Sequence, residues 1–285
     1  MKTSKTGLIR SIACGFAALF MSTSNALVFA QDTATKPDPK ATTEAMPSPQ
    51  ELVDRCITAS GGRANWEKVK SMEQKGTFSM PAMGLTGKLD VKMHTPDMAL
   101  ITINLPGIGE IRDGFNGSVG WAINPMTGPT LKEGDELVQA RRQASFTAQM
   151  DPLASFESSK TVGKSEYAGT ECWQVEATGE DGTSNLYFGV ASGLLCGMSM
   201  IADTPQGKIE IVMQQSEPKK FGDLTLNSKT TISAMGNTQE IVIDSISFEP
   251  IDPAAFKLPP AIATMVKAKE AAESTKEADT SATKE

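Results

Sequence analysis

Residues 89–105, LDVKMHTPDMALITINL, show the clearest structural pattern in this chain of 285 residues. Apolar and polar side chains alternate on both sides of the turn at Pro96-Asp97, with apolar residues at Leu89, Val91, Met93, Ile101, Ile103 and Leu105. A period of two places every second side chain on the same face of a strand. Because a short turn joins the two runs, we predict an antiparallel hairpin with one buried face.

The same alternation continues on either side of this hairpin. It recurs at Val119, Trp121 and Ile123, and again at Ile209, Ile211 and Met213. Turn-forming pairs separate the runs, at Asn116-Gly117, Ser192-Gly193 and Gly236-Asn237. Because no strand is followed by a crossover helix, the strands are predicted to form an antiparallel meander.

Three helices are predicted beside the strands. Ser48 and Glu51 form a capping box at the start of a helix that Gly61-Gly62 ends. A short second helix is predicted over residues 64–69, and a third over residues 134–150. The fold class is therefore mainly β with a few helices (α+β), in a single domain over residues 48–262.

The first thirty residues have the order of a secretory signal peptide. Basic residues precede an apolar run over residues 12–21, and Val28-Phe29-Ala30 offers a cleavage site after Ala30. An uncleaved anchor is the alternative, but the run is shorter than the roughly 20 residues that span a bilayer. We expect a periplasmic protein released in soluble form, with a disordered leader over residues 31–47. Residues 263–285 are expected to form a charged tail that is either disordered or partly helical at its start.

The charge and the residue types exclude several classes of function. With 27 Lys and Arg against 34 Asp and Glu, the net charge of −7 argues against binding to nucleic acid. His94 is the one histidine, and the sequence has neither the ligand spacing of a metal site nor a glycine-rich phosphate loop nor a nucleophile elbow. We therefore predict no catalytic residue, no metal, no cofactor and no enzymatic activity.

Three cysteines remain after cleavage at Ala30, namely Cys56, Cys172 and Cys196. An odd number does not indicate a disulfide framework. Cys172 and Cys196 fall in predicted strands of one meander, so a bridge between them is one possibility. The other is that all three are small buried thiols.

The turns of the predicted meander differ in polarity between the two ends of the sheet. Alternate turns lie at the same end, so Pro96-Asp97 and Asn116-Gly117 belong to a polar end. The other end receives residues 80–84 (MPAMG), 105–109 (LPGIG) and 124–129 (NPMTGP), which carry apolar side chains. Exposed apolar groups gathered in one place mark an interaction site. The alternative is that a helix covers them as ordinary core.

Several short motifs carry a resemblance to a known family. They are Ala59-Ser60-Gly61-Gly62, Gly76-Thr77-Phe78, Pro106-Gly107-Ile108-Gly109, Gly114-Phe115-Asn116-Gly117, Gly120-Trp121, Asn124-Pro125-Met126-Thr127-Gly128-Pro129 and Leu186-Tyr187-Phe188. In this pattern the chain resembles the bacterial outer-membrane lipoprotein-sorting-protein-like group, which is related to the LolA and LolB carriers. The resemblance implies an incomplete antiparallel β-barrel closed by short helices, an apolar concave face that receives acyl chains, and transfer without nucleotide or metal.

These observations lead to a hypothesis for the ligand and its site. We expect a lipid- or lipoprotein-binding carrier that holds acyl chains on the inward rows Leu89, Val91, Met93, Ile101, Ile103, Trp121 and Ile123, with Met83, Ile108 and Met126 at the mouth of the cavity. Fifteen methionines suit an adaptable pocket, because methionine fills irregular space. An envelope hydrolase is the least favoured function, and two further alternatives remain. The barrel can be filled by its own side chains, or the fold can serve as an envelope sensor or interaction module that binds a membrane-protein partner.

Overall fold

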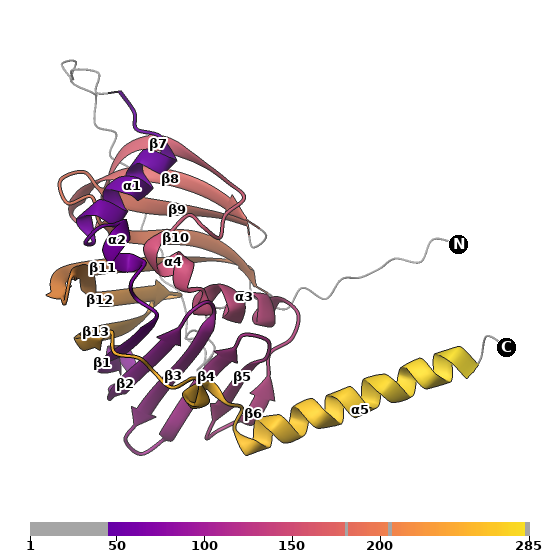
Figure 1. Cartoon of the computed structure of the whole chain (residues 1–285). Helices are drawn as coiled ribbons and strands as arrows, with labels where there is room; N and C mark the ends of the chain where they lie inside the picture. Colours follow the sequence, from indigo (N-terminus) through magenta and orange to yellow (C-terminus); the bar gives the residue numbers. More distant parts are fainter. Residues whose placement is uncertain (1–44, 180–181, 205–206, 283–285) are drawn as a thin grey trace.

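The computed structural model describes residues 45–179, 182–204 and 207–282. In this part of the chain thirteen strands form one antiparallel sheet in the order β6-β5-β4-β3-β2-β1-β13-β12-β11-β10-β9-β8-β7. The sheet is strongly curved and leaves one side open between its edge strands β6 and β7 (Figure 1). The predicted signal peptide and residues 31–44 of the predicted leader lie outside the described residues.

Two meanders make up the sheet. The first contains β1 (Ser71–Met80), β2 (Leu85–His94), β3 (Met98–Leu105), β4 (Gly109–Asn116), β5 (Gly120–Asn124) and β6 (Gly128–Leu131), with the short helix η2 (Pro81–Met83) between β1 and β2. The second contains β7 (Ser158–Tyr167), β8 (Thr170–Gly179), β9 (Gly182–Gly189), β10 (Leu195–Thr204), β11 (Gly207–Phe221), β12 (Leu224–Ala234) and β13 (Asn237–Ser247). The register confirms the antiparallel meander that the alternation predicted.

The pairing of β1 with β13 joins the two meanders, and the sequence pattern did not predict it. Phe78 pairs with Ile241, and the register shifts at a bulge between Lys75 and Gly76. A Cβ atom at Gly76 would overlap the carbonyl oxygen of Val242. The joint between the two halves therefore needs glycine at this position, because the two backbones approach too closely for a side chain.

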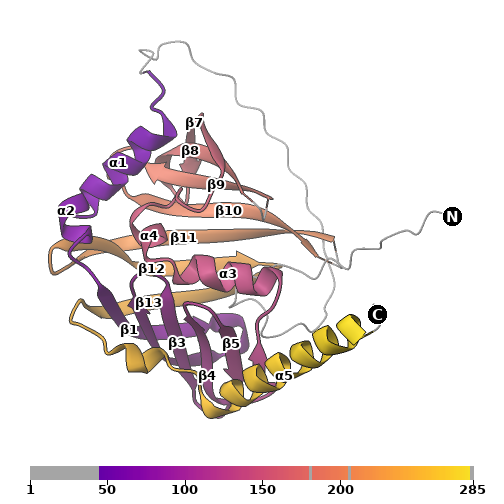
Figure 2. The ribbon, with the colours of Figure 1, turned by 45° about the vertical axis from the view of Figure 1, so that its right-hand side comes forward.

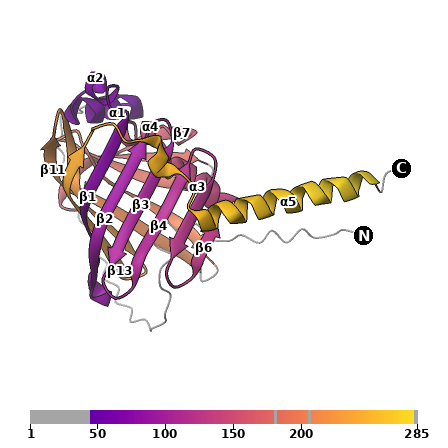
Figure 3. The same ribbon diagram turned by 60° about the horizontal axis from the view of Figure 1, so that its bottom comes forward.

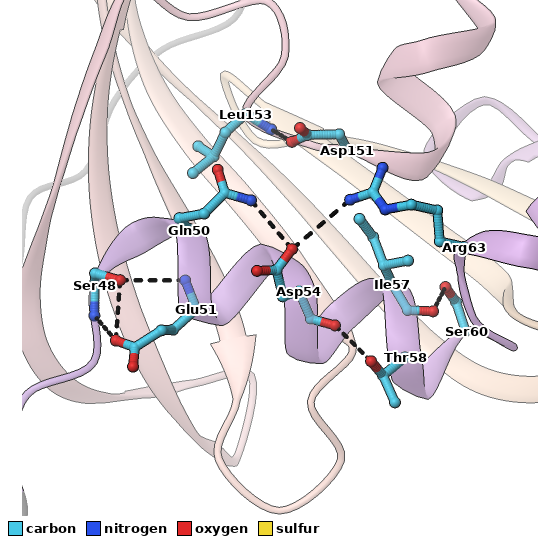
Figure 4. Close-up of polar contacts among 10 residues, drawn as sticks. All are labelled: Ser48, Gln50, Glu51, Asp54, Ile57, Thr58, Ser60, Arg63, Asp151 and Leu153. Carbon is cyan, nitrogen blue, oxygen red and sulfur yellow. Dashed lines mark hydrogen bonds and ion pairs between the residues drawn. The ribbon is translucent and has the colours of Figure 1, made fainter.

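Helices α1 (Pro49–Ala59) and α2 (Arg63–Trp66) cover one end of the curved sheet. The predicted capping box is confirmed: the backbone N–H of Ser48 donates to Oε2 of Glu51 at 2.6 Å, and the backbone N–H of Glu51 donates to Oγ of Ser48 at 3.3 Å (Figure 4). The buried face of α1 belongs to the main core, which contains Leu52, Val53, Cys56 and Ile57 together with Trp173, Val175, Leu186, Phe188 and Leu224.

The segment predicted as one helix over residues 134–150 forms two, α3 (Asp135–Ala144) and α4 (Phe146–Met150). Ser145 between them has an extended backbone, and its hydroxyl accepts a hydrogen bond from the N–H of Ala148 at 3.4 Å. The N–H of Phe146 donates to the carbonyl of Pro96 at 3.0 Å. This break lets the chain cross from edge strand β6 to edge strand β7, so that α3 and α4 lie across the open side of the sheet (Figure 2).

The C-terminal segment forms a helix in the region for which the sequence predicted a charged tail, with helix only at its start. After η3 (Pro253–Phe256), helix α5 covers Pro260–Ala282 and extends away from the sheet (Figure 3). Its alanine, lysine and glutamate residues are strong helix formers, which explains the helix. Ile262 is fully buried, and Nζ of Lys269 lies 2.8 Å from a carboxylate oxygen of Glu133.

Among the described residues, we find no helix with the length and apolar character to cross a membrane.

Candidate functional site

A cavity of about 530 Å³ lies between the concave face of the sheet and the helices that cross it. Strands from both meanders form its floor, and α3, α4 and the loop after α4 form its roof. The apolar part of its described lining includes Met72, Leu89, Val91, Ile101, Met150, Phe156, Leu186, Leu195, Met198, Met200, Met213, Leu226, Ile241, Ile243 and Ile246. The volume is within the range of about 300–1,000 Å³ that small-molecule sites occupy.

Methionine is prominent on the wall that the second meander contributes. Met198 on β10 pairs with Met213 on β11, and Met200 pairs with Ile211 one step further along the same two strands. All three methionines line the cavity and are half-buried. Unbranched thioether side chains change shape at low cost, so this wall can adapt to flexible apolar ligands of different lengths.

Polar side chains also line the cavity at defined places. Gln139, Arg142 and Gln143 come from α3 in the roof, and Gln215 and Asn227 come from the floor. The amide of Asn227 donates to the carbonyl of Leu195 at 2.8 Å. The cavity is therefore apolar over most of its surface, with hydrogen-bonding groups that suit an amphiphilic molecule better than a plain hydrocarbon.

An ion pair anchors the chain just before α3. Nζ of Lys132 lies 2.7 Å from Oδ1 of Asp113 on β4, and the two side chains are only 12% and 24% exposed. Burial raises the pKa of the Asp113 carboxyl above its usual value, while the Lys132 ammonium acts in the opposite direction. Asp113 lines a second cavity of about 40 Å³, which lies against Ala140, Gln143 and Ala144 of α3.

The residues predicted to bind the ligand lie at several places. Leu89, Val91 and Ile101 line the main cavity. Met93 lines the small cavity beneath α3 instead. Ile103 is buried in a separate core cluster with Phe78, Met80, Leu89, Leu105 and Ile243.

Trp121 and Ile123 lie on the other face of the sheet. Residues paired directly across antiparallel strands share a face. Ile101 pairs with Asp113, and Asp113 pairs with Ala122, so the residue of β5 that shares the face of Ile101 is Ala122. Trp121 pairs with Gly114 and is buried against it. The alternation in β5 indicated a strand correctly, but a period of two does not say which face is inside.

The residues predicted at the cavity mouth lie at the end of the sheet, as the meander required. Met83 belongs to η2, Ile108 to the turn between β3 and β4, and Met126 to the turn between β5 and β6. These three are not among the described residues that line the main cavity. Met83 and Met126 are exposed, and Ile108 is half-buried.

Sequence reasoning missed the part of the cavity that β10 to β13 provide. Part of the signal was present, because Ile209, Ile211 and Met213 recur with a period of two, as do Ile241 and Ile243, although valine at positions 212 and 242 blurs the apolar-polar alternation. These strands could not be placed opposite β2 and β3 without the pairing of β1 with β13.

Cys56, Cys172 and Cys196 are all free thiols. In the described part of the chain we find no group of three or more His, Cys, Asp or Glu side chains arranged to hold a metal ion.

The architecture is that of an open half-barrel whose concave face, roofed by helices, encloses a largely apolar cavity. Solved structures share the fold: a LolA superfamily protein from Nitrosomonas europaea is 10% identical over 74% of this chain and 98% of its own, with a TM-score of 0.51. A DUF1329 family protein from Desulfovibrio piger is 9% identical over 73% of this chain and 96% of its own, with a TM-score of 0.54. The LolA-like fold that the sequence predicted is therefore confirmed. No protein-family model matches the sequence, and a search of curated proteins finds no match.

Proposed function

We propose that this protein is a periplasmic carrier that binds the acyl chains of a lipid or lipoprotein in the cavity beneath α3 and α4. The observation that carries the proposal is the cavity itself, about 530 Å³ with a predominantly apolar lining. The likeness of the fold to a LolA superfamily structure supports it. The signal-peptide pattern of residues 1–30 supports export.

The physical basis of carriage is the removal of methylene groups from water. Each buried methylene contributes about 0.8 kcal/mol, so an acyl chain of ordinary length gains enough free energy to stay bound during transfer. Release requires that the pocket can also close on itself. The methionines at positions 198, 200 and 213 suit both states, because they can repack when the ligand leaves.

A homologous series of saturated fatty acids tests this function. Each acid displaces an environment-sensitive fluorescent fatty acid from the purified protein, and the displacement gives its Kd. We expect the affinity to rise roughly fourfold per methylene, since about 0.8 kcal/mol is gained each time. The rise should stop at the chain length that fills about 530 Å³.

The plateau distinguishes a cavity from a surface. Adsorption to an exposed apolar patch would make the affinity increase with chain length without reaching a limit. An affinity that does not change with chain length, or no displacement of the probe by any acid, would contradict the proposed function.

A further inference from the structure

Four neighbouring hairpin tips form an apolar rim along one end of the sheet. They contribute Met126 from the turn between β5 and β6, Ile108 from β3 and β4, Met83 from η2, and Met235 from β12 and β13. These hairpins follow one another in the order of the sheet, although Met235 is far from the others in sequence. Met83, Met126 and Met235 are 41%, 60% and 57% exposed. Three flexible apolar side chains therefore stand in solvent along one line.

The four tips of the rim contain no charged residue. They read PAMG (81–84), PGI (106–108), PMT (125–127) and MG (235–236). Two turns at the opposite end of the sheet do carry a charged residue, since Asp97 lies between β2 and β3 and Asp223 lies between β11 and β12. That end is also where α1 and α2 lie: the Ser60 carbonyl after α1 accepts a hydrogen bond from the N–H of Thr225. Turns are ordinarily polar, so an uncharged methionine rim indicates a surface that contacts an apolar partner.

We propose that the apolar rim docks the protein onto a zwitterionic lipid bilayer. Peripheral binding depends on the apolar area buried at the interface and on attraction between basic residues and anionic lipids. The rim offers only the first contribution, and the net charge of −7 opposes binding to anionic lipid. A bilayer whose surface has no net charge therefore complements the rim. The rim residues do not line the cavity, so this docking does not depend on whether the cavity holds a ligand.

Flotation with phosphatidylcholine vesicles tests the docking surface. The exported protein is purified in its processed form and compared with the triple variant Met83→Gln, Met126→Gln and Met235→Gln. We expect the wild-type protein to float with the vesicles and the triple variant to lose roughly tenfold or more in apparent affinity. The binding should persist in high salt, because no ion pairs contribute to it.

The matched control removes exposed apolar groups elsewhere. Met46→Gln and Val162→Gln change side chains that are similarly exposed but lie outside the rim, and they should leave flotation unchanged. All variants share one N-terminus, so any contribution from that segment is common to them. The proposal is overturned if the wild-type protein does not float, if the control weakens binding as much as the triple variant, or if binding requires anionic lipid. Fatty-acid displacement in the triple variant should match the wild type, which separates this test from that of the cavity.

Discussion

The double variant Met200→Gln and Met213→Gln should bind fatty acids roughly thirtyfold more weakly than the wild-type protein. Both side chains line the cavity wall from β10 and β11. An amide that faces a bound acyl chain loses its hydrogen bonds to water, at a cost of about 1 kcal/mol or more for each side chain. A combined loss of about 2 kcal/mol corresponds to that thirtyfold change in Kd. Displacement of the fluorescent fatty acid measures it.

The control for this variant lies on the same two strands. Ile201 directly follows Met200, and Val212 directly precedes Met213. Their side chains therefore lie on the opposite face of the sheet. Ile201→Gln and Val212→Gln together should leave the affinity unchanged. Equal losses in the two double variants would show that the ligand does not lie in the cavity, and so would an unchanged affinity in the methionine variant.

Lys132→Met should lower the free energy of unfolding by about 3 kcal/mol, since breaking a buried ion pair leaves its partner as an uncompensated charge. Lys132 and Asp113 are both largely buried beside α3. The double variant Lys132→Met and Asp113→Asn removes both charges and should recover most of the loss. Urea unfolding measures each difference. A double variant as unstable as Lys132→Met would contradict this account.

The stability that Lys132→Met loses relative to wild type should become smaller as the pH falls. Burial already raises the pKa of Asp113, and the removal of Lys132 takes away the interaction that lowers it. A carboxyl whose pKa is higher in the folded than in the unfolded state destabilises the folded protein at pH values above the folded-state pKa. That cost is relieved as the pH falls through the folded pKa. The deficit of Lys132→Met relative to wild type should therefore shrink at acidic pH, and a deficit that stays constant would contradict the prediction.

Local patterns predicted local structure well in this chain. The capping box at Ser48 and the alternation from Leu89 to Leu105 depend on residues close together in sequence, and both are confirmed. The break at Ser145 was missed because it depends on a hydrogen bond from Phe146 to Pro96, some fifty residues away. The pairing of β1 with β13 was missed for a similar reason, since an alternating strand does not identify its neighbour.

The candidate site was predictable only in part. Leu89, Val91 and Ile101 line the cavity, and the alternation of apolar and polar residues in β2 and β3 identified the face on which they lie. Trp121 and Ile123 lie on the opposite face because the turn at Asn116-Gly117 sets the register of β5, which the alternation alone cannot do. The contribution of Met200, Met213 and Ile241 required knowledge of how the sheet curves back over itself.

Native mass spectrometry of the protein purified from its own cells, without detergent, tests the central proposal most directly. We predict a complex heavier than the polypeptide by the mass of an acyl-bearing molecule, which collisional activation releases. The Met200→Gln and Met213→Gln variant should retain much less of it. A polypeptide that carries no acyl-bearing molecule, whether alone or in a stable complex with another protein, would contradict the assignment as a carrier.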